Sequence, residues 1–117
     1  MKHQIIIRPE AENDLRESFL WYEEKRQGLG HDFLLQIEAG LKFIQRNPEL
    51  TPVEYKEARK CIIKKFPYKI IYLFKNDAIF VLAVLHGKRS PALLKNRIDH
   101  MQKQVVYRCQ TAHIVIN

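Results

Sequence analysis

The fold is decided by the stretch FPYKIIYLFKNDAIFVLAVLHGKRSP at residues 66–91. Two apolar runs, residues 68–75 and 78–86, flank an Asn-Asp pair at residues 76–77, and both of these residue types tolerate a tight two-residue turn. The stretch therefore predicts a β-hairpin. Because the second run is apolar at every position up to Leu85, we expect it at the centre of a sheet with both faces covered.

Two amphipathic helices are predicted before this hairpin. Residues 4–8 hold three consecutive isoleucines, which favour a short strand, and Pro9 then pre-sets the backbone for a helix. Apolar residues recur at helical spacing in two series that are separated by a Gly-containing break at residues 27–30: Ala11, Leu15, Phe19 and Tyr22, and then Leu29, Phe33, Ile37, Leu41 and Ile44. So short a break predicts an antiparallel helical hairpin.

The remaining segments complete an α+β fold. Residues 48–56 contain two prolines and predict a loop, whereas residues 58–66 predict a lysine-rich strand at a sheet edge. Residues 92–101 predict a short helix, and residues 105–117 fit an extra strand, a partner-binding arm or a disordered tail. We expect an N-terminal strand, a helical hairpin packed on one face of a largely antiparallel four-stranded sheet, and a short C-terminal helix. Residues 1–101 would form a single domain and residues 102–117 a C-terminal extension.

Composition narrows the function classes. Among 117 residues, 20 Lys and Arg outweigh 13 Asp and Glu, and the net charge of +7 favours a polyanion or an acidic protein as partner. Cys61 and Cys109 have no metal-ligand or redox spacing, and the five histidines are scattered, so we expect no metal and no cofactor. No apolar run approaches the ~20 residues that cross a bilayer, and the expected location is the cytoplasm.

A series of short motifs carries a resemblance to a known family. In chain order they are the Pro-Glu-Ala that begins at Pro9, Tyr22-Glu23-Glu24 before Gly28-Leu29-Gly30, Asn47-Pro48, Arg59, Phe66-Pro67-Tyr68 and His86-Gly87-Lys88-Arg89-Ser90-Pro91. From about residue 5 to residue 91 the chain resembles the RelE/ParE toxin superfamily of bacterial type II toxin-antitoxin systems. The Phe-Pro-Tyr motif and the strand that ends in His-x-x-Arg-x-Pro look more like the ParE branch.

This resemblance implies three alternative functions. The first is a ParE-like toxin that inhibits DNA gyrase by binding and is neutralised by a cognate antitoxin. The second is a RelE-like endoribonuclease that cuts mRNA on the ribosome, and the third is an inactive binding module of the same fold. Whether the chain is an enzyme, and in which oligomeric state it acts, stay open at this stage.

Five basic residues are the candidates for binding a target or a phosphate: Arg59, Lys64, Lys65, His86 and Arg89. A metal-independent ribonuclease needs proton-transfer groups and cations around the phosphate, and Arg59, His86 and Arg89 would supply them. The plainer interpretation is that His86 bonds to backbone and that Arg89 binds a carboxylate, because a guanidinium suits carboxylate and phosphate equally. Lys64 and Lys65 alternate along the predicted strand, so only one of them can face a given site.

Two aromatic residues of the first helix have a structural expectation. Trp21 and Tyr22 are expected to pack under the helical hairpin, and stacking on a base is the alternative.

Overall fold

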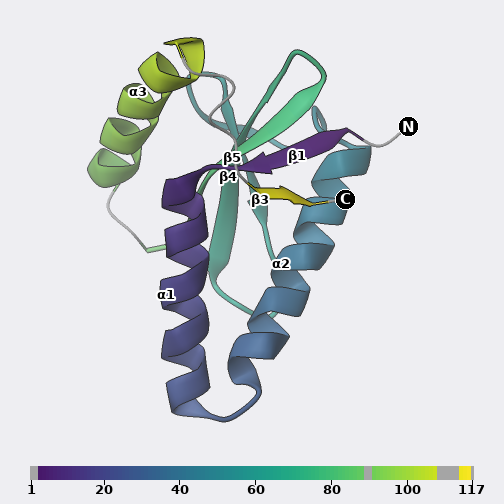
Figure 1. The fold of residues 1–117 in the computed structure, drawn as a ribbon, viewed down its shortest axis with the longest axis vertical. Coiled ribbons are helices and arrows are strands. Elements are labelled where there is room, and N and C mark those ends of the chain that lie inside the picture. Colours follow the sequence, from purple (N-terminus) through teal and green to yellow (C-terminus); the bar gives the residue numbers. More distant parts are fainter. Residues whose placement is uncertain (1–2, 89–90, 108–113, 117) are drawn as a thin grey trace.

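A mixed β-sheet with helices on both faces forms the molecule, and the computed structural model describes residues 3–88, 91–107 and 114–116 of it (Figure 1). In chain order the elements are β1 (Gln4–Ile7), α1 (Pro9–Lys25), α2 (Leu29–Arg46), β2 (Val53–Tyr55), β3 (Ala58–Ile62), β4 (Tyr68–Lys75), β5 (Ala78–His86), α3 (Pro91–Tyr107) and β6 (Ile114–Ile116). Figure 1 shows α1 and α2 as an antiparallel pair, with α3 standing apart from them. The predicted α+β class and the helical hairpin are confirmed.

The sheet has six strands in the order β2-β3-β4-β5-β1-β6 within the described ranges, two more than the four expected. β1 runs parallel to β5, and the other neighbouring strands pair antiparallel. The prediction of a largely antiparallel sheet is therefore confirmed. One additional strand, β6, lies in the segment 105–117, for which an extra strand was one of three alternatives, and it pairs with β1.

The other additional strand, β2, lies in the segment 48–56 that the prolines suggested to be a loop. It forms because a turn at Lys56, whose φ is 53°, folds residues 53–55 back against the start of β3. Val53 pairs with Arg59 and Tyr55 with Ala58. The edge strand on this side of the sheet is therefore β2, and not β3 as had been expected. β3 itself ends at Ile62, earlier than the predicted residue 66.

α3 is longer than the short helix expected at residues 92–101. It has 17 residues and packs Leu94 and Ile98 against the face of the sheet opposite to the α1–α2 hairpin. The apolar series in the sequence ends near Met101, but the following Gln and Lys residues are good helix formers and allow the helix to continue.

The core has two halves, one on each face of the sheet. The half under the hairpin contains Ile5 and Ile7 of β1, and the half under α3 contains Ile6, as the alternation of a strand requires. β5 is buried from Ile79 to Leu85, which confirms its predicted central position. Its alternation is interrupted because Tyr72 pairs with Val81 whereas Ile71 pairs with Ala83, which leaves Leu82 as an extra residue in the strand.

Candidate functional site

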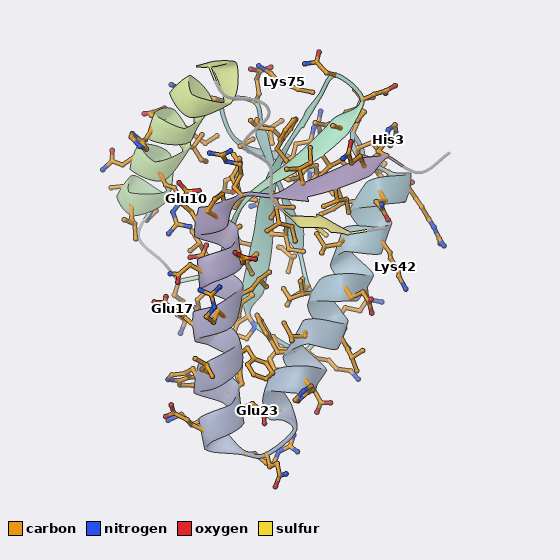
Figure 2. The ribbon with its side chains drawn as sticks, in the orientation of Figure 1. His3, Glu10, Glu17, Glu23, Lys42 and Lys75 are labelled. Carbon is orange, nitrogen blue, oxygen red and sulfur yellow. The ribbon has the colours of Figure 1, made fainter. Side chains whose placement is uncertain are left out.

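A cleft of about 520 Å³ lies between α1 and the adjoining ends of β4 and β5. Its walls are formed by Asp14, Glu17, Ser18, Trp21, Tyr22, Pro67, Tyr68, Val84, Leu85 and His86. In Figure 2, Glu17 projects from α1 on the side away from α2. The cleft contains His86, one of the five predicted site residues, together with hydroxyl and carboxyl groups.

The cleft exists because β1 is shorter than β5. β1 ends at Ile7 opposite Val81, and Pro9 turns the chain into α1, so the rest of β5 has no strand neighbour on this side. The backbone N–H of Val84 donates instead to Asp14 Oδ2 at 3.0 Å. Arg97 of α3 donates to the same oxygen at 2.5 Å, and this ion pair connects the helices on the two faces of the sheet.

The extra residue in β5 turns His86 toward α1, where it is half-buried against the Tyr68 ring at a centroid distance of 5.4 Å. Its Nδ1 accepts a hydrogen bond of 3.1 Å from the backbone N–H of Lys88. In the neutral imidazole the proton is therefore on Nε2, which can act as a donor. Backbone bonding is the plainer of the two roles considered for this histidine.

Three hydroxyl groups line the floor of the cleft. Ser18 Oγ donates to Tyr68 Oη at 3.3 Å, and the pKa of Tyr22 is raised by burial and by its neighbour Tyr68. Tyr22 also contacts the rings of Phe33 and Phe66, so its predicted packing under the hairpin is confirmed. The same prediction is wrong for Trp21, which is 54% exposed because it lies one position further around the helix, at the mouth of the cleft.

Arg59 does not join this cleft. Its Nη1 donates to the carbonyl oxygens of Thr51 at 2.5 Å and Glu49 at 3.1 Å, and so it holds the segment after α2 against β3. Arg59 pairs with Tyr72 of β4, whereas His86 pairs with Tyr68. These two positions are four residues apart along β4, which corresponds to about 13 Å.

Lys64 and Lys65 lie in the bend after β3 and not on a strand as expected. The bend reaches the end of β5, where the backbone N–H of Gly87 donates to the Pro67 carbonyl at 2.7 Å. Both lysines are exposed, and they lie nearer to the His86 end of the sheet than Arg59 does. Arg89, the fifth predicted site residue, lies outside the described residues.

A second concavity, of about 510 Å³, runs between α2 and β3, and we call it the α2–β3 groove. It is lined by Gln36, Ala39, Gly40, Phe43, Thr51, Pro52, Lys60, Cys61, Ile62, Ile63 and Lys64. Phe43 and Ile62 are 42% and 69% exposed, although both are apolar. Gly40 allows the close approach of α2, because a Cβ there would lie 3.0 Å from Ile70 Cδ1.

Sequence reasoning missed this groove. Its two signals were an isolated glycine within a helix and an apolar residue, Ile62, on the face of an edge region that carries lysines. Burial raises the pKa of the Cys61 thiol in its wall. In the part of the chain that the structure covers, no three His, Cys, Asp or Glu side chains gather as metal ligands, and no helix has the length and apolar character to span a membrane.

Comparison with known proteins gives consistent matches. The sequence model of the ParE toxin of the type II toxin-antitoxin system parDE matches residues 5–91. The protein Toxin ParE2 of Mycobacterium tuberculosis, in strains CDC 1551 and H37Rv, is 26% identical over 100 residues, which cover 85% of this chain and 95% of the relative. A solved structure titled as the chromosomal ParDE system of P. aeruginosa has the same fold, with a TM-score of 0.64, 16% identity, and coverage of 70% of this chain and 92% of that one.

Proposed function

Because the chain belongs to the ParE toxin family of type II toxin-antitoxin systems, we propose that it acts in the cytoplasm by binding DNA gyrase and that a cognate antitoxin neutralises it. Inhibition by binding needs an exposed surface and no assembled catalytic group. The observation that carries this choice is the placement of Arg59, whose guanidinium is bonded to two loop carbonyls about 13 Å along the sheet from the His86 row. A phosphate cannot be held by both Arg59 and His86 in this arrangement.

The α2–β3 groove is the proposed antitoxin site. Its apolar floor suits the hydrophobic side of an amphipathic segment, and Lys64 at its rim makes no ion pair with the described carboxylates. An acidic segment would supply the missing charge. Antitoxin segments that order on binding must bury substantial apolar surface to offset the loss of chain entropy, and exposed Phe43 and Ile62 provide it.

The test of the target compares two assays on the purified chain. Added to gyrase and relaxed plasmid, it should block supercoiling, whereas translating ribosomes should keep their mRNA intact. Cleavage of mRNA without an effect on gyrase would replace the proposal by the ribonuclease alternative, and no effect in either assay would indicate an inactive binding module.

The groove is tested with two matched variants of exposed β-branched residues. Ile62→Glu places a charge in the groove, and Val53→Glu places the same charge outside it, where the side chain is 52% exposed. We expect Ile62→Glu alone to abolish rescue of growth by the co-expressed cognate antitoxin. Equal rescue of both variants would place the antitoxin elsewhere.

A further inference from the structure

The cleft between α1 and β5 has the opposite charge to the rest of the protein. The chain carries a net charge of +7, yet the two side chains of full charge that line this cleft, Asp14 and Glu17, are both carboxylates. Asp14 is engaged by Arg97, whereas Glu17 makes no ion pair with any described residue. A phosphate or another polyanion would meet repulsion here, and a cation would be attracted.

Two cations of the chain already contact residues that line this cleft. Arg97 pairs with Asp14. The ammonium of Lys25 lies 4.6 Å from the centre of the Trp21 ring, in the geometry of a cation–π contact. The Glu17 carboxylate and the Tyr68 ring line the same hollow.

We propose that this cleft is an anchor site for the arginine side chain of a protein partner. A guanidinium can bond in a bidentate manner to Glu17 while its plane stacks on an aromatic ring, which a compact ammonium does less well. Its methylene stem would contact the apolar side chains of Pro67 and Val84 in the wall of the cleft. The Nε2–H of His86 is then available for a carbonyl of the partner's backbone.

This assignment does not depend on the identity of the inhibited enzyme. The volume of about 520 Å³ is within the range of side-chain and small-molecule sites. The α2–β3 groove has lysines on its rim and fits an acidic segment, so the two concavities select partners of opposite charge.

The test uses Nα-acetyl-arginine-amide as probe and Nα-acetyl-citrulline-amide as its neutral match. Trp21 is the only tryptophan of the chain, so its indole N–H resonance reports on the cleft without assignment by mutation. Addition of the arginine probe should shift the Trp21 and His86 resonances saturably, with a Kd on the order of a few millimolar. The citrulline probe should not shift them.

Two variants with the same change of charge complete the test. Glu17→Gln should weaken the arginine probe about fivefold, as expected for the loss of one exposed ion pair. Glu24→Gln removes a carboxylate of the same helix that does not line the cleft, and it should leave the affinity unchanged. Equal shifts with citrulline, or equal effects of the two variants, would overturn the proposal. Tighter binding of guanosine monophosphate with the same dependence on Glu17 would also overturn it and would identify a nucleobase site.

Discussion

The turn between α1 and α2 provides the sharpest prediction on stability, because two glycines of one helix should respond differently to the same substitution. A Cβ added to Gly30 would lie 2.6 Å from the Phe19 carbonyl oxygen and 2.7 Å from Glu23 Cγ. A carbonyl within a helix cannot rotate away, so α1 and α2 would have to separate. Gly30→Ala should therefore destabilise the fold, although Ala is normally the better helix former by about 1 kcal/mol.

The magnitude follows from three contributions. Overpacking costs about 1–3 kcal/mol, and the clash with a backbone atom places Gly30 at the upper end. Separation of the helices also strains the hydrogen bond of 2.7 Å from the Gly30 N–H to Glu23 Oε1. After the gain in helix propensity, the net loss should be about 3 kcal/mol, or about 10 °C in Tm for a domain of this size.

Gly40→Ala is the control in the same helix. A Cβ there would contact Ile70 Cδ1 at 3.0 Å and Ile63 Cγ2 at 3.3 Å, which are the ends of side chains that can move. Its free energy of unfolding should remain within about 1 kcal/mol of the wild type. Urea unfolding followed by circular dichroism measures both variants, and a Gly30→Ala protein as stable as Gly40→Ala would refute the reasoning.

Three further outcomes are expected. Asp14→Ala removes the carboxylate that pairs with Arg97 and accepts from the backbone N–H of Val84. Urea unfolding should therefore detect a decrease of about 3 kcal/mol in the free energy of unfolding, and a decrease below about 1 kcal/mol would contradict the role of this pair. The hydrogen bond from Lys69 holds the pKa of Glu54 below its usual value. The ionised Glu54 therefore stabilises the fold above its unfolded-state pKa, and this stabilisation disappears as pH falls through the folded-state pKa. The decrease in the free energy of unfolding between pH 6 and pH 3 should be smaller in Glu54→Gln than in the wild type, and an equal decrease would exclude this contribution. Because Cys61 is buried and its pKa is raised, its thiol in a Cys109→Ser variant should react with Ellman's reagent far more slowly in buffer than in urea. Equal rates would show that the groove wall opens.

The sequence predicted the parts of the fold that depend on local periodicity. The apolar series of the two long helices and the two runs around residues 76–77 each define a face that must be buried, and burial of those faces fixes a hairpin on a sheet. β2 was not predictable in this way because it has only three residues and directly follows Pro52. Its pairing depends on a positive φ at Lys56, a residue type that gives no such signal.

The site was predicted less well, for a physical reason that Arg59 illustrates. Residue types can indicate phosphate chemistry, but the partners of a guanidinium are decided by loops whose carbonyls have no signature in the sequence. Arg59 is taken up by the segment after α2, and β3 ends before Lys64 and Lys65. His86, predicted as a target- or phosphate-binding residue, does line a cleft. The carboxylates Asp14 and Glu17 of the same cleft were not predicted, because they lie on a helix face that resembles ordinary solvent-exposed charge.

The extra residue at Leu82 has a consequence for how the chain tolerates change. Side chains alternate between the two faces of a strand. The number of residues between Val81 and the end of β5, odd or even, together with the bulge that Leu82 forms, therefore decides on which face of the sheet the His86 side chain lies. Deletion of Leu82 would restore regular alternation and leave His86 opposite Tyr68 on the α1 side. A slip of the strand by one residue that removed the bulge without a deletion would instead carry His86 across to the α3 side. The α1 cleft would then lose its imidazole through a change in the interior, with no substitution at its surface.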